Sequence, residues 1–548
     1  MSAVDDTVTV ATFARALADA YGDREAVVDE RRRSTYVDLD RESVELALRL
    51  IERGVGKGDR IGMWMGNSVD WVVAFFAIAR CGAVAVPLST FFREPELARV
   101  VRHADLRGLL TDRTFLGNDC LSAIERALPG LAKASHPYLA LKEAPYLRWV
   151  ATIEAHPDMA PWATVLRVGR PTGVPPATEA LLREIEREVY PADDAIMIYT
   201  SGSTAEPKGV PHSNAVVVGK THFLKEAFEI TEQARSYTAS PFFWVGGLTM
   251  SLFPVLSAGG TQFCSERFDA GSFLRMVELE RVTRAHLYPH HIEAILAHPD
   301  FSRRDRSSMR EGDPRLLVRP AAPGRADGLK VGLGMTETFG GYWWGVPDAE
   351  AAAAMGPLRP GERRPPPLDR LAPGVELKVV DADGRAVGDG GRGEIVIRGW
   401  GVTRGLHKQP PSRAFDRNGF FHTGDEGEVR GRRVYFRGRL GDMIKTAGAN
   451  VAPPEVEAAL CSLDDISEAY VVPLDDPVRG QVVAAAVVPA PGAAVDADAV
   501  RSRLRDLIST FKVPVHIVVF AATEIPWTPS HKVKKPELAA MVAARVAR

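Results

Sequence analysis

Cysteine is scarce in this sequence. Only four of the 548 residues are cysteines, and no two of them lie close together: Cys81, Cys120, Cys264 and Cys461. Structural zinc sites and dithiol redox sites need closely spaced cysteines, so the sequence excludes both kinds of site. The same scarcity favours a reducing compartment, and we expect a cytoplasmic protein.

An excess of charge of one sign is also lacking. The chain has 68 Lys and Arg against 70 Asp and Glu, a net charge of −2. Proteins that hold nucleic acid or an anionic membrane through charge usually carry a basic surplus. We therefore expect neither a nucleic-acid partner nor a charged membrane surface.

Long apolar runs are missing as well. The run WVVAFFAIA, residues 71–79, is bounded by Asp70 and Arg80 and is too short to cross a bilayer. It predicts a buried helix instead. The first ten residues, MSAVDDTVTV, are acidic and do not have the pattern of a secretory signal peptide. We expect no membrane span.

Helices and strands alternate over the first 190 residues. The patterns predict helices over 12–21 and 36–54, strands at EAVVD, RIGMWM and AVAVPL, and a helix cap at Asn67-Ser68. Such alternation is typical of an α/β fold with a mostly parallel sheet. The stretch from Val375 to Gly399 instead predicts antiparallel hairpins, and 548 residues are enough for at least two domains.

The stretch YTSGSTAEPKG, residues 199–209, follows the apolar run AIMIY. It is not a Walker loop, because Lys208 stands between Pro207 and Gly209. Its hydroxyls, its glycine and its single lysine nevertheless suit a phosphate-binding loop, although a plain polar loop would have a similar composition. Ser213 is placed to cap the helix that follows.

Six further motifs follow this loop in order: PFFWVGG (241–247), GMTET (334–338), GEIVIRG (393–399), HTGD (422–425), GRLGDMIKTAGANVAPPEVE (438–457) and IPWTPSHKVKKPEL (525–538). Together the seven motifs resemble those of the acyl-adenylate-forming superfamily, which includes acyl-CoA synthetases, peptide-synthetase adenylation domains and beetle luciferases. The resemblance extends over nearly the whole chain.

The resemblance implies an α/β fold in two domains. The large N-terminal domain, residues 1–438, would combine mixed and parallel sheets, helices and a β-rich subdomain. A hinge at 439–442 would join it to a small, mobile α+β domain, 443–548, which carries the lysine segment. The implied activity is that of an AMP-forming acyl-CoA ligase: a carboxylic acid attacks ATP to give acyl-AMP, the small domain rotates, and CoA then takes the acyl group.

The resemblance also implies roles for single residues. Lys208 and the loop would hold the β- and γ-phosphates, Thr336 the α-phosphate and Glu337 a Mg²⁺ ion, which prefers oxygen ligands. Lys532 would join the acid to the α-phosphate in the first step only. The other nucleotide-binding residues would be Thr200, Ser201, Gly202, Ser203, Thr204, Leu333, Gly334 and Met335, with Asp425 and Arg439 at the ribose.

The implied acyl pocket contains Trp244, Val245, Gly246, Gly247, Gly340 and Gly341. We expect the two glycines of FGGYWW, residues 339–344, to make space and the aromatic side chains beside them to line it, which favours a sizeable apolar acid. Packing of these aromatics in the core is the competing interpretation. Trp244 and Gly448 would border the CoA tunnel, and Gly441 would be the hinge residue.

Several positions depart from the pattern of the superfamily. Ala205 and Glu206 stand in the phosphate loop, Leu333 takes the place of an aromatic residue, Gly441 stands at the hinge, and His531 precedes the lysine. These departures allow a second hypothesis, an enzyme that only forms the thioester from acyl-AMP supplied by a partner adenylating enzyme. A non-catalytic acyl-nucleotide-binding protein, a carrier-loading adenylation domain and a luciferase-like oxygenase are further alternatives.

Overall fold

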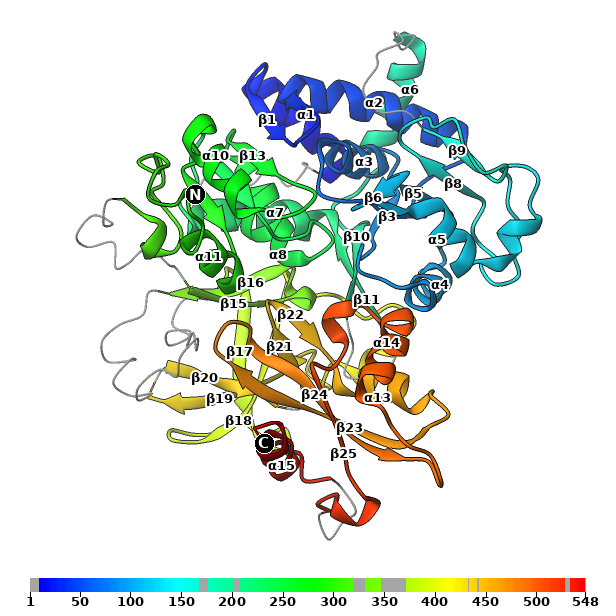
Figure 1. Ribbon diagram of the computed structural model, residues 1–548. Coiled ribbons are helices and arrows are strands. Elements are labelled where there is room, and N and C mark those ends of the chain that lie inside the picture. The colour runs from blue at the N-terminus through cyan, green and yellow to red at the C-terminus, as the bar shows by residue number, and fades with distance from the viewer. Residues whose placement is uncertain are drawn as a thin grey trace.

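The computed structural model describes residues 9–166, 176–200, 207–318, 331–345, 371–431, 433–440, 443–527 and 533–547. Figure 1 shows a large N-terminal part, which contains most of the helices, above two smaller β-rich parts. The sequence-predicted fold class, a large α/β part with a β-rich subdomain and a smaller α+β domain, is confirmed.

A seven-stranded sheet forms the centre of the N-terminal part. Its strands are parallel except at the edge, where β10 and β11 form an antiparallel hairpin. In spatial order they are β11 (Lys208–Ser213), β10 (Asp194–Thr200), β4 (Val84–Pro87), β3 (Arg60–Trp64), β5 (Gly108–Thr111), β8 (Trp149–Thr152) and β9 (Ala163–Val165).

A second sheet of five strands lies in the same part of the chain. Its order is β14 (Arg284–His286), β12 (Arg235–Thr238), β13 (Thr261–Cys264), β1 (Glu25–Val28) and β2 (Arg33–Thr35), with only β2 antiparallel. The small hairpin of β6 (Thr114–Phe115) and β7 (Asn118–Asp119) stands apart from both sheets.

Three helices supply much of the core shared by the two sheets: α1 (Val10–Tyr21), α2 (Tyr36–Glu52) and α3 (Val69–Arg80). Every residue of α3 is buried, which confirms the interpretation of WVVAFFAIA. Ser68 caps α3 by accepting a 3.1 Å hydrogen bond from the Trp71 amide, as the sequence predicts. Among the described residues, no helix combines the length and the apolar character that crossing a membrane would require.

In the part of the chain that the structure describes, the other N-terminal α-helices are α4 (Glu94–His103), α5 (Cys120–Ala127), α6 (Pro176–Arg187), α7 (Asn214–Ala227), α8 (Val245–Gly247), α9 (Phe253–Ser257), α10 (Ala270–Glu280) and α11 (Pro289–Leu296). Ser213 caps α7 by accepting a hydrogen bond from the Val216 amide at 3.4 Å, as expected.

The described strands between residues 331 and 439 pair in antiparallel fashion. The hairpin of β15 (Val331–Met335) and β16 (Gly340–Gly345) precedes a four-stranded sheet of β17 (Val375–Val380), β18 (Arg392–Gly399), β19 (Phe421–Arg430) and β20 (Arg433–Arg439). This sheet confirms the antiparallel region predicted from residue 375 onward.

The C-terminal part builds its own five-stranded sheet. The strands are β22 (Ala449–Val451), β21 (Ile444–Thr446), β24 (Gly480–Pro489), β23 (Ile466–Asp476) and β25 (His516–Val519). The helices are α13 (Pro453–Cys461), α14 (Ala497–Leu507) and α15 (Lys535–Val546). Two apolar clusters, one built around α13 and α14 and one around α15, give this part cores of its own.

Candidate active site between the two domains

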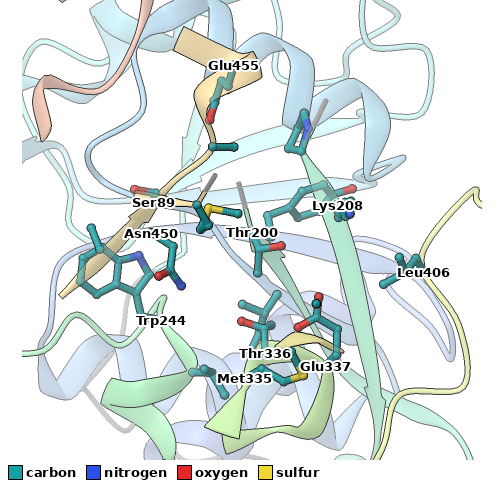
Figure 2. A pocket seen from close by; sticks show the side chains of 18 of the residues that line it. Ser89, Thr200, Lys208, Trp244, Met335, Thr336, Glu337, Leu406, Asn450 and Glu455 are labelled. Atoms are coloured by element: carbon teal, nitrogen blue, oxygen red, sulfur yellow. The ribbon is translucent and has the colours of Figure 1, made fainter. Parts of the chain in front are cut away.

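A cavity of about 860 Å³ lies between the N-terminal and C-terminal parts. Its walls come from β10 and β11, from the turn after β15, from the segment before α8, and from the β21–β22 turn of the C-terminal part. Figure 2 shows Thr200, Lys208, Trp244, Thr336, Glu337, Asn450 and Glu455 around this space. The fold thus brings together residues as far apart in the sequence as Ser89 and Lys512.

The hairpin of β10 and β11 carries the predicted phosphate loop. Thr200, the last residue of β10, lies directly opposite Lys208, the first residue of β11, and both line the cavity. The loop that joins them, with Ser201, Gly202, Ser203, Thr204, Ala205 and Glu206, lies outside the described residues.

The turn at Thr336 and Glu337 faces this hairpin across the cavity. A short 3-10 turn, Thr336–Thr338, connects β15 to β16, and its two first residues line the cavity together with Gly334 and Met335. In Figure 2, Thr336 and Glu337 lie below Thr200 and Lys208, and Trp244 lies to the left of these four residues. A hydroxyl, a carboxylate and an ammonium group therefore converge on one space, which suits a polyanion with a bound cation.

Two backbone contacts fix the Thr336–Glu337 turn. The imidazole Nε2 of His212 lies 2.7 Å from the carbonyl oxygen of Thr336. The Thr403 amide donates to the carbonyl of Glu337 at 2.7 Å. His212 is fully enclosed, and burial lowers its pKa to about 4, so the ring is neutral at pH 7. Because a carbonyl oxygen only accepts hydrogen bonds, Nε2 carries the proton.

The predicted acyl-pocket residues divide into two groups. Trp244, Val245 and Gly246 line the cavity. Gly247, Gly340 and Gly341 are not among the lining residues; a β-carbon on Gly247 would stand 2.1 Å from the Pro241 carbonyl oxygen, and one on Gly340 would stand 2.5 Å from Thr249 Oγ1. Close packing explains these two glycines.

The aromatic residues of FGGYWW do not line the cavity as expected. Phe339 belongs to the main N-terminal core, and Tyr342 and Trp343 belong to the core of the antiparallel region, all with no exposed surface. The expectation that these side chains line the pocket is wrong at these three positions. The apolar surface of the cavity comes instead from Ile198, Phe243, Trp244, Val245 and Tyr288.

The residues predicted at the nucleoside lie along β15, β19 and β20. Asp425 is 4% exposed, and its backbone lies opposite that of Arg439 in the ladder between β19 and β20. Its neighbours Thr423 and Gly424 line the cavity, whereas Asp425 does not. Leu333 packs on the core of the antiparallel region and is also absent from the cavity wall.

The C-terminal part closes the cavity with the turn between β21 and β22. Gly448 has a left-handed backbone with φ of +87°, and a β-carbon there would stand 2.3 Å from the ring of Tyr288 in the N-terminal part. Only glycine fits this position without a shift. Gly448, Ala449 and Asn450 all line the cavity, as Trp244 does. That the CoA tunnel passes between Trp244 and Gly448 stays a prediction.

The lysine segment is described only at its two flanks. Trp527 and Val533 form an antiparallel bridge, Trp527 packs edge-on against Tyr470, and Val533 contacts the core around α15. Neither flanking residue lines the cavity, and Figure 1 shows α15 far from α8. Lys532, His531 and Gly441, the residue predicted at the hinge, lie outside the described residues.

Several residues that line the cavity were not predicted as site residues, although some of them lie within the seven motifs. Glu394 of GEIVIRG accepts hydrogen bonds at 2.8 Å from the Gly424 amide and pairs at 2.8 Å with His422 of HTGD. Tyr288, Phe511 and Lys512 line the cavity from segments with no motif that points to them. His212 follows the phosphate loop directly, but nothing in the sequence connects it with Thr336.

Comparison with known proteins identifies the family of the chain. The family described as "AMP-binding enzyme" matches residues 14–407, and "AMP-binding enzyme C-terminal domain" matches residues 455–532. The acyl-CoA ligase sidI of Aspergillus fumigatus is 30% identical over 96% of this chain and 90% of its own length. An indoleacetate–CoA ligase of Aromatoleum aromaticum is 29% identical, with 93% of this chain and 94% of that protein covered.

The fold of the chain also resembles that of a solved structure. The amide bond synthetase McbA of Marinactinospora thermotolerans superposes with a TM-score of 0.76 at 25% identity, covering 97% of this chain and 99% of that one. The family matches occupy most of the chain, and the relatives match along its whole length. The chain therefore belongs to the AMP-binding enzyme family.

Proposed function

We propose that the protein converts a sizeable, largely apolar carboxylic acid into its CoA thioester through an acyl-AMP intermediate. The observation that carries the proposal is one cavity whose wall has a polar side, with Thr200, Lys208, Thr336 and Glu337, and an apolar side, with Trp244 and its neighbours. The polar side suits the phosphates of ATP, and the apolar side suits the acid.

The nucleotide would be held by groups from three segments. Lys208 would pair with the β- and γ-phosphates and Thr336 with the α-phosphate, because a fixed ammonium and a hydroxyl complement phosphate charge. Glu337 offers a carboxylate to Mg²⁺, which when bound offsets phosphate charge. Asp425 and Arg439 would hold the ribose, next to Thr423 and Gly424, which line the cavity.

The acid is inferred from the aromatic surface of the cavity. Phe243, Trp244 and Tyr288 present large faces to it, and the relative from Aromatoleum is named for an acid with an aromatic ring system. Aromatic surface favours ligands that bury apolar area, so acetate would leave most of this wall unused.

We infer that the relative placement of the two domains suits the second step, the formation of the thioester. Gly448 and Asn450 reach the cavity, while the flanks of the lysine segment pack elsewhere. We infer that the C-terminal domain turns about residues 439–442 so that Lys532 can reach the cavity during adenylation. The same placement is compatible with the second candidate function, thioester formation alone from acyl-AMP that a partner enzyme supplies.

A paired assay tests both functions. One reaction contains the acid, ATP, Mg²⁺ and CoA, and the other contains synthetic acyl-AMP and CoA; indoleacetate, ferulate and acetate are compared in each. Thioester in both reactions supports the complete ligase, and thioester only from acyl-AMP supports the second candidate. A preference for acetate would contradict the proposed acid class, and binding without product would indicate an acyl-nucleotide-binding protein.

A further inference from the structure

A buried ion triad connects the two domains. The ammonium of Lys512 lies 2.6 Å from Glu96 Oε1 and 2.6 Å from Glu455 Oε1. The three side chains are 5%, 6% and 11% exposed, respectively. Glu96 belongs to α4 of the N-terminal domain, whereas Lys512 and Glu455 both belong to the C-terminal domain. One contact of the triad therefore crosses between the domains and the other does not.

Two further hydrogen bonds hold the carboxylate of Glu96 in place, one from each domain. It accepts a hydrogen bond at 2.9 Å from the Arg93 amide at the start of α4. Ser509 Oγ donates to its second oxygen at 2.8 Å. Both carboxylate oxygens of Glu96 are thus engaged, and each makes a contact with the C-terminal domain.

The opposite charges of the triad attract one another in the observed placement of the two domains. Burial lowers the pKa of Lys512, but the two carboxylates outweigh burial and the pKa is raised overall. Burial raises the pKa of Glu455, and the ammonium of Lys512 opposes that rise. A buried charge is stable only when it is paired. Glu96 is therefore paired with Lys512 only while the domains stay together, whereas Glu455 belongs to the same domain as Lys512.

The residues before Lys512 make further contacts with the N-terminal domain. Thr510 Oγ1 accepts a hydrogen bond from Arg93 Nη2 at 2.9 Å. The ring of Phe511 lies 5.7 Å from that of Phe91 and 6.4 Å from that of Trp244, in edge-to-face geometry. Residues 509–512 therefore act as one contact segment.

Glu455 connects this contact segment to other residues that line the cavity. Glu455 stands in the first turn of α13, and residues 448–450 and 452–455 line the cavity. The bond from Lys512 to Glu455 thus connects the contact segment to the stretch that carries Gly448 and Asn450.

We propose that Lys512 is a positioning residue that holds the Gly448 turn in the cavity for the thioester step, with Glu96 as the partner it leaves when the domain turns. This inference rests on the proposed function, because it assumes a rotating C-terminal domain. Glu455 moves with Lys512 and keeps the ammonium paired in either orientation, so rotation breaks only the contacts to Glu96, Arg93 and the aromatic rings.

The test compares Glu96→Gln with Glu94→Gln. Glu94 lies on the same helix but pairs with the exposed Arg126, so it is the matched control. Hydrogen–deuterium exchange followed by mass spectrometry should show faster exchange in segments 89–97 and 444–456 of E96Q and unchanged exchange in 60–64. With synthetic acyl-AMP and CoA, thioester formation by E96Q should slow by about tenfold while the KM for ATP stays unchanged.

The outcomes that would contradict the role of Lys512 differ from those that would contradict the proposed function. Exchange and thioester rates in E96Q that equal those of E94Q would overturn the proposal, as would faster exchange with an unaltered thioester rate or faster exchange along the whole chain. Lys512→Met should reproduce E96Q; if it fails to fold, E96Q alone decides. Failure of every variant and the wild type to form product would contradict the proposed function, while the exchange pattern would still test the contact.

Discussion

The imidazole of His212 reaches the carbonyl oxygen of Thr336 at 2.7 Å and so connects the strand after the phosphate loop to the turn that faces it. The two residues are 124 positions apart. The ring also packs against Phe339, with 5.1 Å between ring centroids. His212 therefore holds β11 and the Thr336–Glu337 turn together.

We predict that His212→Leu weakens ATP binding. The substitution removes one of two donors to the carbonyl of Thr336, because the Phe339 amide still donates to it at 3.0 Å. Loss of one hydrogen bond costs about 0.5–1.5 kcal/mol and loosens the turn. The KM for ATP should rise about tenfold, measured by pyrophosphate release at saturating acid. Since His212 is neutral above its pKa of about 4, the wild-type profile between pH 5 and 8 should contain no inflection from this residue. His222→Leu, at a half-buried histidine on α7, is the control, and an equal loss there would contradict the role of His212.

Lys532 should act in the first step alone. We expect Lys532→Ala to reduce pyrophosphate release by roughly 10²–10³, the usual loss when one charge-stabilising donor is removed. Thioester formation from synthetic acyl-AMP should stay within about twofold of wild type. Lys534→Ala, at a lysine that pairs with Glu537 on the surface, should change neither rate. Equal losses in both half-reactions of Lys532→Ala would disprove a step-specific role.

Trp244 should matter for the second substrate. Its ring contacts those of Phe91, Tyr288 and Phe511 at the domain boundary. Each aromatic pair contributes about 0.5–1.5 kcal/mol, so Trp244→Ala should raise the KM for CoA about tenfold in the thioester step. Trp244→Phe should recover most of that loss because it keeps an aromatic face. An effect confined to the KM for ATP would argue against this placement.

Lys220 should make stability depend on pH. It is fully buried under β16 and donates to the Gly341 carbonyl at 2.9 Å, and burial lowers its pKa to about 7 from 10.5. Between these values the unfolded chain binds a proton that the folded chain has released, so the free energy of unfolding rises with pH. The penalty for burying the charged form is complete below pH 7 and fades toward pH 10.

We therefore expect the stability of the wild type relative to Lys220→Met to increase by up to about 1.4 kcal/mol for each pH unit from 7 upward. Urea unfolding at pH 7, 8 and 9 measures this slope. Lys225→Met, on the same helix and partly exposed, is the comparison. Parallel pH profiles for wild type and Lys220→Met would show that Lys220 does not titrate in this range.

Local patterns predicted the N-terminal elements well. The helices at Val10–Tyr21 and Tyr36–Glu52, the all-buried helix at Val69–Arg80 and the caps at Ser68 and Ser213 all follow from apolar spacing and side-chain oxygens beside free amides. Each depends on residues that are near one another in the chain. The seven motifs likewise identified the family because they are short and occur in order.

The aromatic stretch FGGYWW shows where such reasoning fails. Tyr342 and Trp343 pack against the antiparallel sheet, and Gly340 is glycine because Thr249 stands against it. Apolar side chains look the same in a sequence whether they line a cavity or fill a core. Which of these they do depends on segments that meet only after folding.

The sequence by itself determined the family, the α/β class, the order of the motifs and the chemical character of Lys208, Thr336 and Glu337. Tertiary structure alone decided that His212 supports Thr336, that Gly448 lies on Tyr288, and that Lys512 bridges Glu96 and Glu455. The physical reason is range: helix periodicity and caps act within one or two turns of chain. Burial and charge pairing depend on distances in space, which separation along the sequence does not set.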